Sequence, residues 1–372
     1  MMEFSFRALN PRLQSLLVVR LSAMGDVIHA MPAVTALREA FPHATLGWVI
    51  EERWAELLCT LRYPRSGPRS PERPLVDRVH TVNFSGWRRA PLSFNTLQQI
   101  AAGLSELQGI NYDVVVDFQG AIRSALLARC ARTATIFGDA QPRENVASMY
   151  YTRRVQTDAP HVVEQALGLA AAVIDRGAAG NGASAAFARR SAPEVVFPLD
   201  ADAERKASSL VKELGQFVIL TPGAGWGAKQ WPVERYGALA RELARDGLRS
   251  LVNFGPGENL LADEVEAASS GTARKVSCSI AELIALTRRA RLLIGGDTGP
   301  LHLAAALKVP VVAIFGPTNP ARNGPFGARA IVLRSAISLT DHSRHRQPEQ
   351  GLLEITSQEV AAAARTLLHE CR

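Results

Sequence analysis

The segment from Leu292 to Pro320, LLIGGDTGPLHLAAALKVPVVAIFGPTNP, constrains the fold of this chain more than any other. A short apolar run ends on two glycines, a turn with an acid and a hydroxyl follows, and a helix of small residues leads to a second apolar run. This order predicts a strand–turn–helix–strand unit of a parallel sheet. The turn presents backbone N–H groups at the helix N-terminus, where an anion is stabilised. Pro300 suits the first helical turn, and Asp297 or Thr298 is suited to cap it.

The same alternation of apolar runs and helical spacing continues along the chain. Further strands are predicted at 16–21, 45–50 and 113–118, and at the starts of 217–225 and 248–258. Near-continuous apolar runs are typical of strands buried on both faces, and hence of parallel sheets. We therefore expect an α/β fold with two Rossmann-like domains facing a central cleft.

At 372 residues the chain is long enough for two domains of ordinary size. A connector rich in Gly, Ala and Ser at 177–186 marks the boundary between them. We expect an N-terminal domain at 1–180, a linker at 181–192 and a second domain at 193–345, followed by a C-terminal segment at 346–372.

Composition is that of an ordinary globular protein, with 47% hydrophobic and 21% charged residues. No apolar run approaches the ~18–20 residues that span a bilayer, and the first residues lack the order of a signal peptide. We therefore expect a cytoplasmic protein. The four cysteines have no CxxC spacing, which predicts reduced thiols and no zinc site.

Positive charge gathers in one part of a chain whose formal net charge is +7. Glu72 and Asp77 are the acids among these arginines: Arg62, Arg65, Arg69, Arg73, Arg78, Arg88 and Arg89. No nucleic-acid-binding motif accompanies them, so nucleic acid is not expected as a partner. An anionic lipid surface and a phosphorylated acceptor both fit. A solvated loop is the simpler alternative, since the stretch from Tyr63 to Pro74 is rich in Pro, Arg and Ser.

The first candidate loop, RLSAMGDVIHAMP, follows the strand predicted at 16–21. Gly25 permits a close approach of the backbone to a ligand. Asp26 stands at a helix start, where it is either a helix cap or a general base for an incoming hydroxyl. Arg20 and His29 flank it and are candidates to hold an anionic acceptor.

The second and third candidate loops follow the strands of the second domain. TPGAGWGAKQWP, which begins at Thr221 and includes Gly225, offers backbone amides and the Lys229 ammonium to a phosphate. NFGPGE ends on Glu258, whose carboxylate can accept both hydroxyls of a ribose. The alternatives are a solvated surface lysine and an exposed acid near a helix start. The GxGxG pattern alone is a weak dinucleotide signal.

The fourth loop contains Asp297, Thr298, Gly299 and His302. The sequence Gly-Gly-Asp-Thr-Gly contributes little to core packing, but it is well suited to an anion-binding site at a helix N-terminus. For His302, a buried and hydrogen-bonded histidine is the alternative. Asp200-Ala-Asp202 fits a DxD metal pattern, but its place before a helix predicts capping instead.

These loops, in this order, resemble the bacterial heptosyltransferases that build the lipopolysaccharide inner core, which form glycosyltransferase family 9. The resemblance covers nearly the whole chain and rests on these motifs: SAMGDVIHAMPAVTALR, DFQGAIRSALLAR, PRENVASMYYTRRV, GAKQWP and GGDTGPLHLAAAL. The SxMGDVxH form is more similar to the first enzyme of the pathway than to the second. The family implies the glycosyltransferase-B architecture, in which the final helix commonly crosses back to the N-terminal domain.

The resemblance also implies a reaction: inverting transfer of L-glycero-D-manno-heptose from ADP-heptose to a Kdo residue of Kdo-lipid A. The N-terminal domain would bind the acceptor and the second domain the nucleotide-sugar. No obligatory metal or other cofactor is implied. Partners would be the donor, an anionic lipid-linked sugar and the cytoplasmic face of the inner membrane, and we expect a monomer.

By position, Asp26 matches the family's catalytic base and Lys229 the lysine that contacts the donor diphosphate. The fourth loop matches the donor-binding loop, and Glu258 is a looser match to a ribose-binding acid. Arg143 and Glu144 match a segment near the acceptor.

The chain departs from the family's pattern in a stretch at 62–74 that resembles an insertion. The resemblance therefore predicts the ADP-sugar donor more strongly than it predicts the Kdo-lipid A acceptor. Three alternatives stay open: a related transferase with another donor or acceptor, a non-catalytic nucleotide-sugar-binding homologue, and a dehydrogenase.

Overall fold

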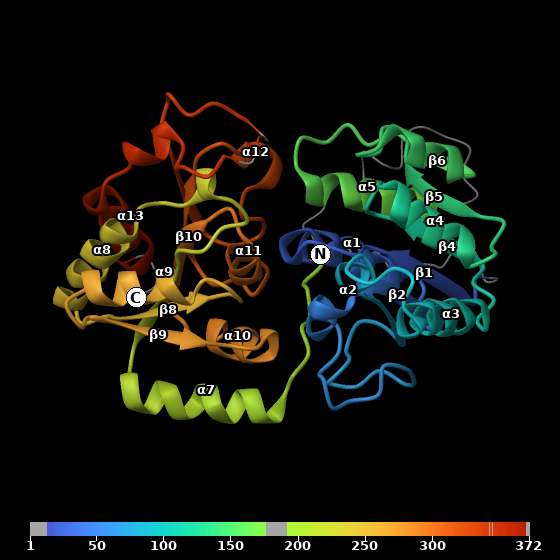
Figure 1. The fold of residues 1–372 in the computed structure, drawn as a ribbon, viewed down its shortest axis with the longest axis horizontal. Coiled ribbons are helices and arrows are strands. Elements are labelled where there is room, and N and C mark those ends of the chain that lie inside the picture. Colours follow the sequence, from blue (N-terminus) through green and yellow to red (C-terminus); the bar gives the residue numbers. More distant parts are fainter. Residues whose placement is uncertain (1–12, 176–191, 342, 344, 370–372) are drawn as a thin grey trace, which may run out of the picture. The chain divides into compact units, whose positions relative to one another are not determined.

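The computed structural model describes residues 13–175, 192–341, 343 and 345–369. The chain forms two compact units, Met1–Leu199 and Asp200–Arg372, and each contains a parallel sheet with helices packed against it (Figure 1). The predicted α/β fold with two Rossmann-like domains is confirmed.

Six parallel strands form the sheet of the first unit, in the order β3-β2-β1-β4-β5-β6. The strands are β1 (Ser15–Val19), β2 (Thr45–Glu51), β3 (Arg78–Val82), β4 (Val114–Asp117), β5 (Ile136–Asp139) and β6 (Arg153–Val155). Val18 of β1 pairs with Trp48 on one side and with Val116 on the other. Every residue of β1 is buried, as its continuous apolar run predicts.

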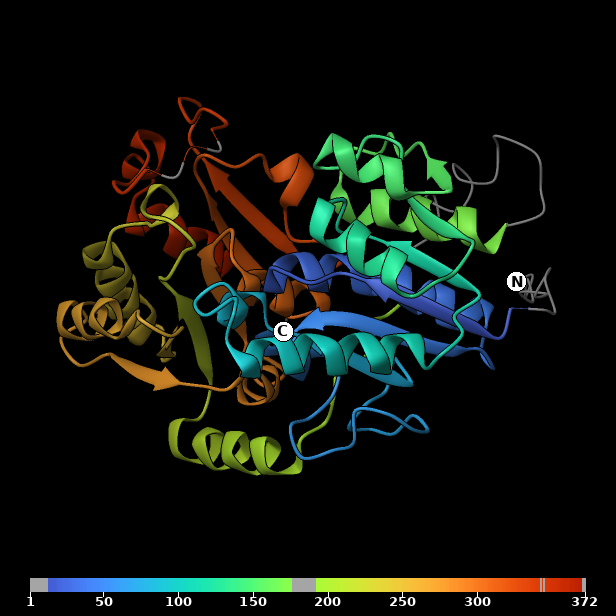
Figure 2. The same ribbon diagram turned by 45° about the vertical axis from the view of Figure 1, so that its right-hand side comes forward.

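Among the described residues of this unit are five helices and two short 3-10 turns. They are α1 (Met24–Ala40), η1 (Glu52–Leu57), α2 (Phe84–Trp87), α3 (Phe94–Gln108), α4 (Ile122–Cys130), η2 (Asn145–Tyr150) and α5 (Val162–Ile174). Helices α1 and α5 pack against each other. Helices α3 and α4 lie side by side along the sheet face that carries Leu17 and Val19 (Figure 2).

The sheet of the second unit repeats the same topology, in the order β12-β11-β10-β7-β8-β9. Its strands are β7 (Phe217–Thr221), β8 (Arg249–Phe254), β9 (Ala273–Ser277), β10 (Leu292–Gly296), β11 (Val311–Phe315) and β12 (Ala330–Arg334). Numbered in chain order within each unit, both sheets read 3-2-1-4-5-6, which is the order of the Rossmann fold.

Helices cover both faces of this second sheet (Figure 1). One face carries α7 (Ala201–Leu214), α10 (Ile280–Thr287) and α11 (Gly299–Ala306). The other carries α8 (Val233–Arg245), α9 (Asn259–Ala268) and α13 (Ser357–His369). Shorter helical segments are η3 (Gly227–Lys229), α12 (Pro320–Asn323) and η4 (Gln350–Leu353).

The final helix corrects one expectation. Val360 and Leu367 of α13 pack into the core of the second unit, and the Trp231 indole N–H donates to the Ile355 carbonyl at 2.9 Å just before the helix. Residues 346–369 therefore pack as part of the second unit, where we expected a segment that packs on the N-terminal domain. The apolar face of α13 packs against the second sheet, whose strands precede this helix in the chain.

The boundary between the units also lies later than predicted. The expected linker at 181–192 falls outside the described residues except for its last position. Residues 193–199, expected in the second domain, belong to the first unit. The Leu199 N–H donates to the Pro71 carbonyl at 2.9 Å, and Phe197 is buried. This segment is thereby held to the long loop of the first unit.

Two expectations from composition can be compared with the described residues. No helix among them combines the length and apolarity that crossing a membrane requires. Cys59, Cys130 and Cys278 are free thiols, as predicted, while Cys371 lies outside the described residues.

A substitution at Gly295 tests how tightly β10 and β7 pack at the centre of the second sheet. Gly295 pairs with Thr221 across β10 and β7, and an added Cβ would lie 1.8 Å from the Thr221 Oγ1 and 3.0 Å from its carbonyl oxygen. We expect Gly295→Ala to lower the free energy of unfolding by about 1–3 kcal/mol, because the buried core cannot yield freely. Gly225→Ala, where no atom lies within 4 Å of the added Cβ, is the control and should stay within about 0.5 kcal/mol. Equal urea midpoints for the two variants would contradict this packing.

Candidate functional site

Each sheet reverses its strand order at one point, between β1 and β4 in the first unit and between β7 and β10 in the second. The loops that leave the two central strands turn to opposite faces there, which opens a crevice at the carboxyl ends where open α/β sheets bind ligands. The four candidate loops follow β1, β7, β8 and β10. The structure therefore brings three of them to one edge of the second sheet.

A buried charged cluster links the loops that follow β7 and β10. The Lys229 ammonium lies 2.5 Å from Asp297 Oδ2 and 3.2 Å from the Asp297 carbonyl oxygen. His302 Nε2 lies 3.0 Å from Asp297 Oδ1, and all three side chains are at most 11% exposed. Lys229 also lies 4.5 Å from the ring centre of Trp226. Lys229 is therefore no solvated surface lysine, and His302 is buried but engaged with the acid of the loop.

The residues of this cluster determine the pKa of Asp297. Burial by itself raises the pKa of Asp297, but the hydrogen bond from His302 and the charge of Lys229 outweigh burial. The result is a pKa well below the usual carboxyl range. Asp297 is therefore ionised at every physiological pH and holds the lysine in place.

The N-terminus of α11 adds an anion-binding feature next to this cluster. Thr298 occupies the cap position, but its hydroxyl lies 3.3 Å from the Gly296 carbonyl and, within the described part of the chain, makes no capping hydrogen bond to the helix. Pro300 occupies the first turn, as predicted. The first amides of α11, beginning at Gly299, are thus not satisfied by the cap side chain and can receive a phosphate.

Glu258 joins the second and third loops. Its Oε2 accepts the Gly255 N–H at 2.7 Å, and a Cβ added to Gly223 would lie within 2.4 Å of both carboxylate oxygens. A side chain at position 223 would therefore clash with the Glu258 carboxylate. The carboxylate keeps capacity for further hydrogen bonds, as recognition of a ribose requires.

Two other residues of the second loop have different surroundings. Thr221 is buried within the sheet at the end of β7, with its Oγ1 3.5 Å from the Ile294 carbonyl, so its side chain serves strand pairing. Gly225 is exposed in open space. Gly227, which sequence reasoning did not single out, is the glycine that packing requires, because its added Cβ would lie 1.7 Å from the Arg346 carbonyl oxygen.

In the first unit, Asp26 is both a cap and an exposed carboxylate. Its Oδ2 accepts the Ala23 N–H at 3.0 Å, and its Oδ1 lies 2.9 Å from Arg20 Nη2. The Asp26 side chain is 42% exposed while that of Arg20 is 15% exposed. The two alternative readings of this residue are therefore compatible, since one oxygen orients the carboxylate and the group still reaches solvent.

Gly25 occupies a position unlike the predicted one, and His29 is buried. Helix α1 begins at Met24, so Gly25 lies buried in its first turn and not in an open turn. His29 is 8% exposed, and its ring packs edge-on against His161 at 5.8 Å between centroids. The structure thus places His29 where α1 meets the start of α5.

A buried network that sequence reasoning missed supports this loop. The Asp117 carboxylate, at the end of β4, accepts the Gln119 N–H, the Ser124 hydroxyl and the Tyr151 hydroxyl, each at 2.8 Å. Burial raises the pKa of Asp117 despite these bonds. Gln119 Oε1 then accepts the Leu21 N–H at 2.9 Å, which ties the loop after β4 to the loop after β1. The only signal available was an acid closing an apolar strand.

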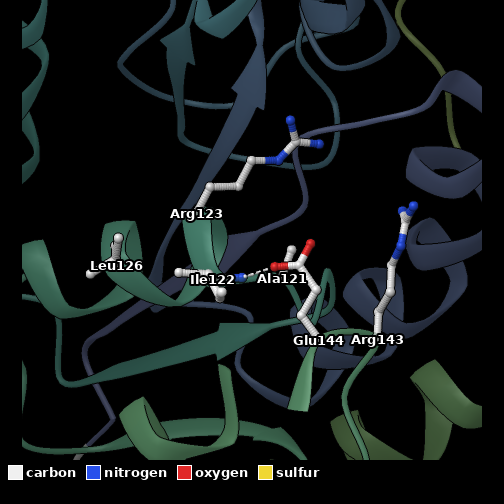
Figure 3. Close-up of a pocket in the computed structure, with 6 residues that line it drawn as sticks. All are labelled: Ala121, Ile122, Arg123, Leu126, Arg143 and Glu144. Atoms are coloured by element: carbon white, nitrogen blue, oxygen red, sulfur yellow. Dashed lines mark hydrogen bonds between the residues drawn. The ribbon is translucent and has the colours of Figure 1, made fainter. Parts of the chain in front are cut away.

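Arg143 and Glu144 line a polar pocket of about 440 Å³ at the start of α4 (Figure 3). Glu144 Oε2 accepts the Ile122 N–H at 2.9 Å, which satisfies an amide of the helix N-terminus. Figure 3 shows the side chains of Arg123 and Arg143 extending in the same direction, with the Glu144 carboxylate between them. Arg123 Nη2 also lies 3.2 Å from the Ser22 hydroxyl of the loop after β1. Sequence reasoning overlooked Arg123, although it stands in the first turn of the helix after a strand end.

Several arginines between residues 62 and 89 serve structure. Arg73 is fully buried, and its guanidinium donates to the carbonyl groups of Pro64, Gly67, Pro68 and Val76. One side chain thereby closes the irregular loop predicted at 63–74.

Ion pairs hold two more of these arginines: Arg65 lies 2.5 Å from Glu52, and Arg69 lies 3.9 Å from Asp77. Arg88 and Arg89 are exposed and have no side-chain partner among the residues that the structure describes. The free positive charge of the segment is therefore concentrated at its end, after β3.

Within the described ranges, no group of three or more His, Cys, Asp or Glu side chains is arranged to hold a metal ion. Asp200 Oδ1 accepts the N–H groups of Asp202 and Ala203, so the DxD pattern is a helix cap, as predicted.

The pKa of Asp297 generates a prediction about stability. A carboxyl whose pKa is lowered by folding stabilises the fold above its unfolded pKa of about 4, and this contribution is lost as the pH falls below that value. We expect Asp297→Asn to reduce the free energy of unfolding by about 3 kcal/mol between pH 5 and pH 8, because Lys229 is left without its buried partner. The deficit should shrink below pH 4. Urea unfolding at fixed pH measures it, and the exposed Glu264→Gln, with the same charge change, is the control. A deficit that does not change down to pH 3 would contradict the assignment.

Known proteins share this architecture. Residues 101–353 match glycosyltransferase family 9 (heptosyltransferase). The chain is 30% identical to lipopolysaccharide heptosyltransferase 1 of Pseudomonas aeruginosa over 86% of its length and 83% of that protein. It is 28% identical to the Escherichia coli K12 protein of the same name, over 92% and 97%. The structure of E. coli heptosyltransferase WaaC with ADP is similar with a TM-score of 0.72 at 26% identity, covering 95% of this chain and 100% of that one. The two-unit α/β fold is thus of the glycosyltransferase-B type, and the chain is a glycosyltransferase that belongs to glycosyltransferase family 9, the heptosyltransferases.

Proposed function

We propose that this enzyme transfers L-glycero-D-manno-heptose from ADP-heptose to the Kdo residue of Kdo-lipid A, with inversion, in lipopolysaccharide inner-core synthesis. The observation that carries the proposal is the buried Lys229–Asp297–His302 cluster beside the N-terminus of α11. The lipopolysaccharide heptosyltransferases among its relatives support the choice of sugar, as does the WaaC structure with ADP-2-deoxy-2-fluoro heptose.

On the donor side, the second unit binds the nucleotide-sugar. Departure of ADP places growing negative charge on the diphosphate, so positive charge already fixed at that point stabilises the transition state. Lys229 supplies an ammonium that Asp297 orients, and the first amides of α11 supply N–H donors. Glu258, next to the same loops, accepts the ribose hydroxyls.

On the acceptor side, the first unit binds the anionic sugar. The attacking hydroxyl has a pKa far above neutrality and must lose its proton as the new bond forms. Asp26 acts as the general base, a contribution worth about 10²–10⁴-fold in rate. Arg20 and the Ala23 N–H orient its carboxylate, and Arg123 and Arg143 receive the acceptor's negative groups.

Several further properties belong to the proposal. The charge on the leaving group is met by Lys229 and α11, so the reaction needs no obligatory metal and no other cofactor. The enzyme acts as a monomer at the cytoplasmic face of the inner membrane, where its acceptor lies. Arg88 and Arg89, exposed beside the carboxyl edge of the first sheet, are suited to contact anionic headgroups there.

Replacing the base tests the mechanism. Asp26→Asn preserves the shape of the side chain and an oxygen that can accept the Ala23 N–H, so the fold should persist. We expect heptose transfer to fall by about 10²–10⁴-fold with little change in ADP-heptose affinity. The control is Glu39→Gln, an exposed acid on the same helix that makes the same charge change. Full activity of Asp26→Asn would refute the role of this carboxylate.

The substrates are tested by measuring transfer from ADP-L-glycero-D-manno-heptose to Kdo-lipid A in the presence of EDTA. Transfer by the wild type supports donor, acceptor and metal independence together. Donor binding without transfer to any acceptor of this class would favour a non-catalytic homologue, and failure to bind ADP-heptose would favour another nucleotide-sugar.

A further inference from the structure

An apolar cavity of about 220 Å³ lies between α3 and α4 in the first unit. One face of α3 lines it with Ile100, Gly103, Leu104 and Leu107, which share the i, i+3, i+4, i+7 spacing of a single helical face. The remaining wall comes from α2, the end of β3 and α4, and it includes Phe84, Trp87, Val82, Leu126, Leu127 and Cys130. The cavity is therefore walled almost entirely by hydrocarbon and aromatic groups.

The deep polar groups of this cavity are already paired. His80 Nδ1 lies 2.9 Å from Glu106 Oε1, and its Nε2 lies 2.8 Å from the Tyr112 hydroxyl. Both nitrogens of the ring are thus engaged inside the protein. A ligand at this position gains from its apolar surface and not from hydrogen bonds.

The apolar cavity adjoins the polar pocket of Figure 3. Arg123 and Leu126 line both spaces, so one arginine stands where the charged and the apolar linings meet. Its guanidinium lies over the Phe84 ring at 5.8 Å from the centroid. The two spaces together match an amphipathic molecule with an anionic head and a hydrocarbon tail.

Exposed apolar residues gather at the start of α3, the helix that lines the cavity. Leu97, 53% exposed, lies one turn before Ile100 on the same helix face, and Leu92 and Phe94 just before it are also exposed. Beside them, Arg88 and Arg89 place positive charge on this surface. Exposed apolar residues beside basic ones, on the helix that lines the cavity, suit an anionic lipid and not a free sugar.

We propose that the α3–α4 cavity binds one aliphatic chain of the lipid-linked acceptor while Arg123 and Arg143 hold its anionic sugar. This inference rests on the proposed function for the identity of the acceptor. It adds a determinant of acceptor recognition: the enzyme distinguishes an acylated acceptor from its deacylated core through the first unit.

Gly103 provides the test, because no atom lies within 4 Å of a Cβ added there. Gly103→Leu therefore begins from an unobstructed Cβ and adds its side chain to the wall of the cavity, and Gly103→Ala is the matched control with little added volume. Both replacements favour a helix more than glycine does. We expect Gly103→Leu to raise KM for acylated Kdo-lipid A by about 10-fold or more, since the lost chain burial weakens binding. The kcat and the KM for the fully deacylated acceptor should not change. Equal effects on both acceptors, or none, would overturn the proposal.

A second measurement does not depend on turnover. Trp87 lines the cavity, so bound ω-bromododecanoic acid should quench its fluorescence in a saturable way. Gly103→Leu should abolish that quenching, and Trp87→Phe should remove its signal. Absence of saturable quenching in the wild type would refute the chain-binding cavity even if heptose transfer is confirmed. Saturable quenching without heptose transfer would support the chain-binding cavity and reject the proposed donor and acceptor.

Discussion

A polar contact ties together the two loops that flank the switch point of each sheet, and both candidate sites are built on such a contact. In the second unit the contact is the ion pair of Lys229 with Asp297, supported by His302. In the first unit Gln119 accepts the Leu21 N–H, and Asp117 holds Gln119 in place. Because parallel strands end at one edge of a sheet, these contacts place the reactive groups where the strand order leaves a crevice.

The two contacts differ in electrostatics in a way that suits their proposed roles. Asp297 is paired with a cation and keeps its charge, so the second unit offers a fixed ammonium and open helix amides to a diphosphate. Asp117 is buried and has no cationic partner among the described residues, and burial raises its pKa, so it serves as a scaffold for the loop. The carboxylate proposed as the general base of the first unit is instead Asp26, which stays exposed while Arg20 orients it. A general base must be accessible to its substrate, whereas a carboxylate that only holds a loop in place must be shielded from it.

Sequence reasoning found the residues that follow strand ends in glycine-rich turns, which is why it identified Asp26, Lys229, Glu258 and Asp297. It could not place His29 on a particular face, because α1 is buried on nearly all sides and helical spacing does not reveal which face meets a ligand. It missed Arg123 and Gln119, whose importance arises from contacts with a loop about a hundred residues earlier in the chain. Arginine content likewise did not reveal that Arg73 is buried within its own loop. The packing of α13 on the second sheet depends on tertiary contacts that no local pattern encodes.

The central claim is that Lys229, held by Asp297, binds the donor diphosphate at the carboxyl edge of the second sheet. Calorimetric titration of ADP into wild type and Lys229→Gln tests it most directly, with the exposed Lys212→Gln as the control for loss of one positive charge. Loss of a charge-assisted hydrogen bond is worth about 1.5–3 kcal/mol, so we expect ADP affinity to fall by about 10- to 150-fold in Lys229→Gln and to stay unchanged in the control. Equal affinity in all three proteins would contradict the account.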